Sequence, residues 1–183
     1  MLKAFLARQI SRMETTWGYD ASYMRRMLAA SPASLLKFGM VSQMVDRRAA
    51  PAEALAAAGI VGTLAEDCGP CTQISVDMAA AAGARPEVLR AILAGDEAGM
   101  GEDARLAWRF ARASLARDLE SVEPLREEVV GRWGDRGLVA LGLQLTAARM
   151  YPTIKYALGY GKTCSRVTVG GEPAPVAHFP VAA

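Results

Sequence analysis

EDARLAWRFARASLARDLES, residues 102–121, holds the clearest helical period in the chain. Its apolar residues recur at spacings of three or four, which places them on one face of an α-helix. These residues are Ala104, Trp108, Ala111, Leu115 and Leu119. The spacing predicts an amphipathic helix across the whole stretch, with Trp108 in the core.

Proline and glycine mark further helices on both sides of this stretch. Ser31 followed by Pro32 is typical of a helix N-cap with proline at the first helical position. Pro51 and Pro86 open helical segments in the same way, and Gly95 is placed to end the second of these. Strand-like alternation is nearly absent. The chain is therefore expected to be all-α, a multi-helix bundle in one domain.

The C-terminal third predicts two more helices and a tail. One helix covers about residues 123–133, and a longer one begins near Asp135 and is apolar on most sides. Such a helix is buried on most sides, by the core or by another subunit. Pro152 is expected to kink or end it. The tail from Val167 holds three prolines and two adjacent glycines, and it indicates an extended arm, either loose or laid on a neighbour.

Charge and hydropathy limit the classes of function. The 183 residues carry a net charge of only +2, which does not indicate binding to nucleic acid or to an anionic membrane. The apolar run at the N-terminus is broken by Arg8 and Arg12 and is not typical of a signal peptide. The longest apolar stretch, residues 137–150, is too short to span a bilayer. A cytoplasmic protein is expected, where reducing conditions disfavour structural disulfides.

Cys68 and Cys71 form the one motif that carries chemistry, within LAEDCGPCTQISVDMAAAAG, residues 64–83. Asp67 is predicted to be the N-cap of a helix, with both cysteines in its first turn. Free backbone N–H groups and the helix dipole stabilise a thiolate there. Two cysteines three residues apart can also close a disulfide with little backbone movement. Polar flanking residues, Glu66 among them, indicate an exposed helix start and a redox-active pair.

Two other interpretations of the pair stay open. A structural zinc site needs four ligands, and only Cys164 and His178 remain to complete one. Both thiols could instead be small apolar core residues. The polar flanks favour the redox interpretation, and no metal or cofactor is expected. Cys164 is then either a bystander or a third redox partner, and His178 is an exposed residue of the tail.

Residues 51–161 resemble the alkyl hydroperoxidase D-like and carboxymuconolactone decarboxylase superfamily. The resemblance rests on the Cys-x-x-Cys helix, PEVLRAILAG, DARLAWRFARASLARDL and WGDRGLVALGLQLTAARMYPTIKYALG. It implies an all-α fold that assembles as a homo-oligomer (dimer, trimer or hexamer). It also implies reduction of a peroxide by Cys68 and Cys71, with Cys71 as the attacking thiol and a dithiol reductant as partner. The core then spans residues 51–162, with an added helical segment at 1–50 and the extended tail at 163–183.

The chain departs from the family pattern at two positions. The histidine that follows the second cysteine by one turn is replaced by Ser75. The family's glutamate falls near Ala56, and the closest acids are Glu53 and Glu66. Loss of a histidine that exchanges protons near neutral pH lowers proton-transfer catalysis by roughly a hundredfold. Glu66 is the candidate substitute base, and Ser75 is a hydrogen-bond donor to the thiolate.

Two hypotheses follow from the sequence. The first is a thiol-dependent oxidoreductase that reduces peroxides or exchanges disulfides. The second is a non-catalytic oligomeric protein of the same fold, with a redox-sensitive cysteine pair. A cluster of aromatic residues near the N-terminus, Trp17, Tyr19 and Tyr23, is expected to serve packing and not ligand binding.

Overall fold

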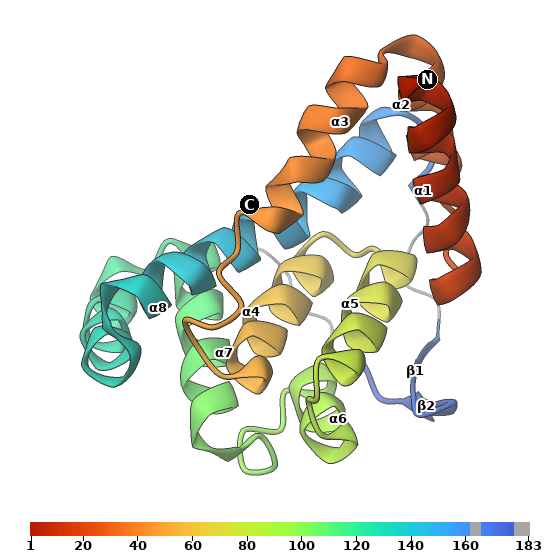
Figure 1. Ribbon diagram of the computed structural model, residues 1–183. Helices are drawn as coiled ribbons and strands as arrows, with labels where there is room; N and C mark the ends of the chain where they lie inside the picture. Colours follow the sequence, from red (N-terminus) through yellow and green to blue (C-terminus); the bar gives the residue numbers. More distant parts are fainter. Residues whose placement is uncertain (162–165, 178–183) are drawn as a thin grey trace.

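The structure is a computed structural model that describes residues 1–161 and 166–177. Within these residues it has eight α-helices, one short 3-10 helix and one β-hairpin (Figure 1). The elements are α1 (Leu2–Trp17), α2 (Ser22–Ala30), α3 (Pro32–Met40), η1 (Val41–Gln43), α4 (Ala52–Ala65), α5 (Gly69–Ala81), α6 (Pro86–Ala94), α7 (Gly101–Ala116), α8 (Leu119–Ala157), β1 (Val167–Val169) and β2 (Glu172–Ala174).

Helix α4 lies at the centre of the main body of the molecule, which consists of helices α4 to α8. Every residue from Ala54 to Leu64 is buried, and α5, α6, α7 and α8 all pack against the helix. Its alanines and glycines allow this, because small side chains let neighbouring helices approach closely. A Cβ on Gly62 would lie 2.9 Å from Ala148 Cβ and 3.1 Å from Leu145 O of α8. An alanine-rich helix of this kind forms because packing surrounds it, not because it has one apolar face.

Proline and glycine positions predict most helix boundaries. Ser31 caps α3 and accepts a hydrogen bond from Ser34 N, with Pro32 in the first turn. Helix α6 begins at Pro86 and ends at Gly95, which has a left-handed conformation. Both predictions are confirmed, and α4 begins directly after Pro51.

The helix predicted over residues 102–121 is too long. Trp108 is buried as expected, but α7 ends at Ala116 with Arg117 in the left-handed region. The next helix begins at Leu119, because the Asp118 side chain accepts a hydrogen bond from Ser121 N and caps it. Leu119 is 75% exposed and is not part of the buried face. The cap formed by Asp118 therefore starts a new helix before the apolar spacing in the sequence comes to its end.

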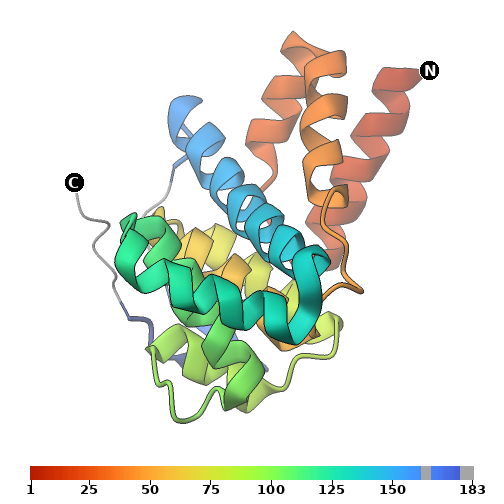
Figure 2. The ribbon, with the colours of Figure 1, turned by 90° about the vertical axis from the view of Figure 1, so that its left-hand side faces the viewer.

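Helix α8 consists of two helical parts that meet at Gly134, whose φ is 67°. Figure 2 shows the two parts running in clearly different directions. This confirms the predicted division between a helix at about 123–133 and one beginning near Asp135. The expected end at Pro152 is wrong, because the helix continues to Ala157. Beyond the proline, Ile154 and Leu158 pack against the N-terminal helices and hold the last turns in place.

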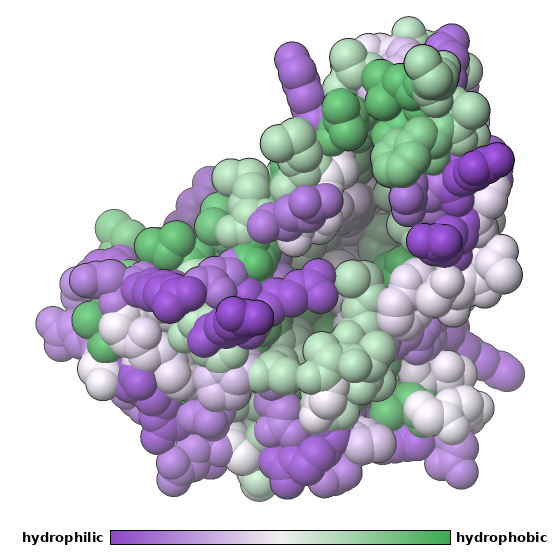
Figure 3. All heavy atoms as spheres, viewed as in Figure 1, coloured by the Kyte–Doolittle hydropathy of each residue, from purple (hydrophilic) through white to green (hydrophobic). Residues whose placement is uncertain are grey.

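Helices α1, α2 and α3 form a second apolar cluster above the main body. The cluster is completed by Tyr151 and Ile154 of α8, by Leu158 directly after that helix and by Ile74 of α5. Figures 1 and 2 show the three helices standing beside the C-terminal part of α8. Apolar side chains also gather on the outside of this region (Figure 3). The exposed ones are Leu2, Phe5, Leu36, Met40 and Met44.

The arm expected from Val167 folds onto the chain's own core in its described part. Strands β1 and β2 pair antiparallel around Gly170 and Gly171, which both have positive φ. Val167 and Val169 are buried in the main core, and Thr168 N donates to Gln73 Oε1 at 2.7 Å. The all-α expectation therefore needs one correction, a two-stranded sheet. No helix among residues 1–161 and 166–177 is both long and apolar enough to cross a membrane.

Helices α4 and α8 pack closely at Gly62 but leave the position of Gly142 open. Alanine substitution is therefore expected to change the free energy of unfolding in opposite directions at the two glycines. Gly62→Ala forces a Cβ into Ala148 and is expected to destabilise the protein by about 1–3 kcal/mol. Gly142→Ala, at an open position in α8, is expected to stabilise it by about 0.5–1 kcal/mol. Urea denaturation of both variants measures the two free energies. Equal effects at the two positions would contradict the close approach of the helices.

Candidate functional site

Cys68 and Cys71 lie at the start of α5, but the cap differs from the prediction. Cys68 itself is the N-cap residue, with extended backbone angles, and α5 begins at Gly69. The prediction that Asp67 is the N-cap is wrong, because Asp67 has a φ of 46° and belongs to the tight turn after α4. Only two residues separate α4 from Cys68, so the chain must reverse there. Cys71 occupies the first helical turn, as expected.

Both thiols are free and deeply buried. The exposed fractions of Cys68 and Cys71 are 0% and 2%, although polar residues flank them in the sequence. The expectation of an exposed helix start is therefore wrong. The N-terminal segment covers the cysteines, because Tyr19 and Tyr23 pack beside them and are themselves buried. The predicted packing role of these tyrosines is correct but incomplete, since they also enclose the dithiol.

A buried lysine that the sequence analysis missed lies at the same site. Lys155 of α8 is 2% exposed, and its Nζ donates a hydrogen bond to the Tyr19 hydroxyl at 3.3 Å. Nζ also lies 4.8 Å from the ring centroid of Tyr19 and 5.6 Å from that of Tyr23. The Tyr19 hydroxyl in turn lies 3.9 Å from Cys71 Sγ. No salt bridge among the described residues includes Lys155.

The two cysteines differ strongly in acidity. A hydrogen bond from the Cys71 thiol, joined by the Cys71 backbone N–H and the positive charge of Lys155, lowers the pKa of Cys68 to about 7, against burial. The same hydrogen bond, together with burial, raises the pKa of Cys71. Negative charge in the resting pair therefore lies on Cys68, while Cys71 keeps its proton. The resemblance implies attack by Cys71, so this thiol must first transfer its proton.

The tyrosines remain neutral beside this charge. Burial is the main reason why the pKa values of Tyr19 and Tyr23 are raised, and the nearby cysteines raise them further. The Tyr19 hydroxyl is thus a hydrogen-bond partner that does not ionise at neutral pH. It connects the lysine amine to the Cys71 sulfur.

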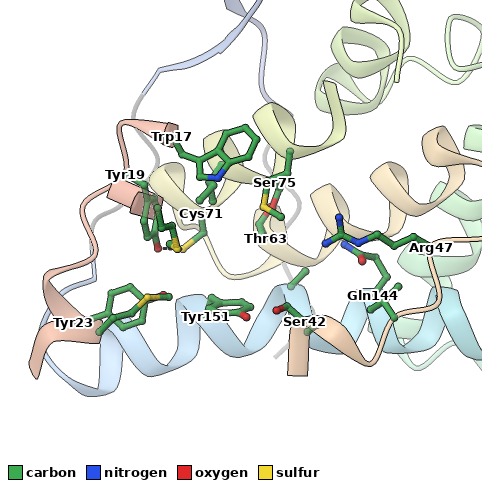
Figure 4. A pocket seen from close by; sticks show the side chains of 17 residues that line it. Trp17, Tyr19, Tyr23, Ser42, Arg47, Thr63, Cys71, Ser75, Gln144 and Tyr151 are labelled. Atoms are coloured by element: carbon green, nitrogen blue, oxygen red, sulfur yellow. Dashed lines mark hydrogen bonds between the residues drawn. The ribbon is translucent and has the colours of Figure 1, made fainter. Parts of the chain in front are cut away.

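A cavity of about 210 Å³ opens at Cys71, between the N-terminal helices and the main body (Figure 4). Its walls come from segments far apart in the sequence: α1, α2, the linker before α4, α5 and α8. Ser75 lines the cavity together with Cys71, one helical turn away. Ser75, at the position where the superfamily that the sequence resembles carries a histidine, therefore faces the cavity. Cys71, and not Cys68, is the sulfur that lines this space.

Glu66, the candidate substitute base, and Glu53, the other nearby acid, are both engaged elsewhere. Glu66 Oε1 accepts a hydrogen bond from Arg149 Nε at 2.6 Å and forms an ion pair with that side chain. Glu53 pairs with Arg85, whose Nε lies 2.8 Å from Glu53 Oε1. Neither acid lines the cavity at Cys71. The sequence-based hypothesis that Glu66 folds over the cysteines therefore has no support in the geometry.

The remaining candidates of the sequence analysis lie outside the described residues. Cys164 and His178 both fall in the parts of the chain that the structure does not describe. Within residues 1–161 and 166–177, no group of three or more His, Cys, Asp or Glu side chains could hold a metal ion.

Comparison with known proteins gives no match: no family model, curated protein or solved structure matches the chain. Lys155 could have been suspected from the sequence, because it stands in an apolar helical stretch with Tyr151 one turn before it and Leu158 almost one turn after it. Nothing in the sequence brings Tyr19 next to it.

Removal of the buried charge is expected to weaken the acidity of the pair. Lys155→Met keeps the length of the side chain but raises the pKa of Cys68, since an opposite charge nearby favours the thiolate. The pH midpoint for alkylation of the pair by iodoacetamide, followed by peptide mass spectrometry, therefore moves upward. Lys3→Met, at an exposed position of α1, is the matched control and leaves the midpoint in place. Identical midpoints for both variants would contradict the role of Lys155.

Proposed function

We propose that the protein is a thiol peroxidase of the alkyl hydroperoxidase D-like type, which reduces small organic hydroperoxides with Cys68 and Cys71. The observation that carries the proposal is the asymmetric pair: one thiol has a pKa of about 7 and the other lines a cavity. The mostly helical fold and the place of the pair at a helix start support it as well. Assignment to the family rests on the resemblance in sequence alone.

Cys68 can take over the proton transfer that the family assigns to the missing histidine. A general acid–base group works best when its pKa lies near the working pH, and a histidine satisfies this at about 6.5. The pKa of Cys68, about 7, is close to that value. Cys68 is also hydrogen-bonded to the thiol whose proton must move. Ser75, at the position of the family's histidine, can form a hydrogen bond but cannot exchange a proton near neutral pH.

The reaction begins with a proton transfer between the two cysteines. The proton of Cys71 passes to Cys68, and the Cys71 thiolate attacks the terminal oxygen of ROOH. The O–O bond breaks, which gives a sulfenic acid on Cys71 and an alkoxide, RO⁻, that takes the proton back from Cys68. The Cys68 thiolate then attacks the Cys71 sulfur and expels hydroxide, which gains a proton from solvent. The products are ROH, water and the Cys68–Cys71 disulfide.

The depth of the sulfurs supports small reactants. A protein disulfide cannot reach residues that are 0% and 2% exposed without movement of the N-terminal segment, whereas a small peroxide can enter the cavity at Cys71. A small external dithiol, oxidised in turn to its own disulfide, returns both thiols by two exchange steps. Peroxide reduction is therefore favoured over disulfide exchange with proteins. Assembly into dimers, trimers or hexamers stays a prediction.

Substitution of each cysteine is expected to stop the reaction at a different step. Cys71→Ser abolishes peroxide consumption, because the attacking sulfur is gone. Cys68→Ser forms the sulfenic acid on Cys71 only slowly, because the acceptor of the Cys71 proton is gone, and it cannot close the disulfide, so that the sulfenic acid stays open to dimedone and turnover is lost. Cys164→Ser is the control and retains turnover, because the pair supplies both thiols. Consumption of cumene hydroperoxide with dithiothreitol measures all three, and turnover by Cys71→Ser equal to that of the wild type would remove the proposal.

A further inference from the structure

The cavity at Cys71 has different chemistry at its two ends. Figure 4 shows Cys71 with Tyr19 and Tyr23 at one end, and the side chains of Arg47 and Gln144 at the other. The wall between them is mostly apolar and rich in methionine, a flexible side chain that adapts to differently shaped ligands. Its members include Met13, Trp17, Met24, Ile74, Met78 and Tyr151.

Arg47 is a cation without a partner in the described part of the chain. It forms no ion pair or hydrogen bond with residues 1–161 or 166–177. The adjacent acid, Asp46, is held by Arg136 and by the backbone N–H of Arg48. The planar guanidinium group, with several donors in a fixed fork, therefore remains available to a ligand. Its geometry matches a carboxylate.

Gln144 is held next to this cation by close packing with α4. Its amide lies directly against Gly59 of α4, where an added Cβ would be 2.6 Å from Gln144 Nε2. The amide of Gln144 also has no hydrogen-bond partner among the described residues. A second cavity of about 230 Å³ adjoins the first, and Arg47 and Gln144 line both. Two unsatisfied donor groups thus face the same space, at the end away from the sulfur.

From this arrangement we infer that the preferred substrate is a small organic hydroperoxide with an apolar body and a carboxylate. The inference rests on the proposed peroxidase function and adds the class of substrate to it. The carboxylate binds Arg47 and Gln144, the apolar body lies against the methionine and aromatic wall, and the hydroperoxide reaches Cys71. Binding of the distant carboxylate then positions the terminal oxygen for attack. The covalent steps are those of the proposed function, with the carboxylate unchanged.

Three hydroperoxides with the same apolar body test the substrate class. They are cumene hydroperoxide, its para-carboxyl derivative and the corresponding para-carboxamide, each reduced with dithiothreitol as the source of electrons. The wild-type protein is expected to prefer the carboxylate over both neutral compounds by about tenfold or more in kcat/KM, since a charge-assisted hydrogen bond to arginine stabilises it. Equal kcat/KM values for the three compounds would overturn the inference.

Two neighbouring arginines provide the matched variants. Arg47→Met is expected to lower the ratio of kcat/KM for the carboxylate to that for cumene hydroperoxide by about tenfold or more. Arg48→Met removes the same charge from an exposed neighbour that does not line the cavity, and it is expected to leave the ratio in place. A similar loss in both variants would show that the overall positive charge of the protein, and not a contact with Arg47, favours the carboxylate. That result would overturn the inference.

A binding experiment separates this inference from the proposed function. The unreactive acid para-isopropylbenzoate is expected to slow alkylation of Cys71 by iodoacetamide in the wild type but not in Arg47→Met. The para-isopropylbenzamide control has no effect on either protein. If no hydroperoxide is turned over but the acid protects Cys71, the proposed peroxidase function fails and the carboxylate site stands. If turnover occurs without protection and without preference for the acid, only the inference fails.

Discussion

The site depends on one physical constraint, the burial of Lys155 where no carboxylate of the described residues lies within ion-pair distance of its amine. Burying an unpaired charge costs several kcal/mol, so the surroundings must compensate it. The Tyr19 hydroxyl and the two tyrosine rings supply part of this compensation. A thiolate on the neighbouring cysteine pair supplies the opposite charge. The same negative charge makes the pair nucleophilic, which links the stability of the buried lysine to the chemistry.

The N-terminal helices turn a cysteine pair at a helix start into an enclosed site. Tyr19 and Tyr23 close the site on the side of the N-terminal helices. The cavity lies between the two apolar clusters. Enclosure strengthens the interaction between the charges, because the local dielectric constant is low. It also restricts access to molecules small enough for the cavity at Cys71.

Local signals in the sequence predict where helices begin and end, but they do not predict which residues come together at the site. Ser31, Pro32, Pro86 and Gly95 mark helix ends correctly because caps, prolines and C-terminal glycines act within one turn of the chain. Burial of the cysteines could not be predicted from their polar neighbours, because the covering segment is far away in the sequence. The contact between Tyr19 and Lys155 joins residues 136 positions apart. A contact between residues so far apart in the sequence leaves no local pattern from which it could be predicted.

The most direct test of the account counts thiolates in the reduced Cys164→Ser protein by ultraviolet absorbance as the pH is raised. The account predicts that one thiolate per chain forms with a midpoint near pH 7. The second thiol remains protonated well above about 8.5, the ordinary value for cysteine. If both thiols ionise together near that ordinary value, the pair neither shares a proton nor feels the buried lysine, and the account is contradicted.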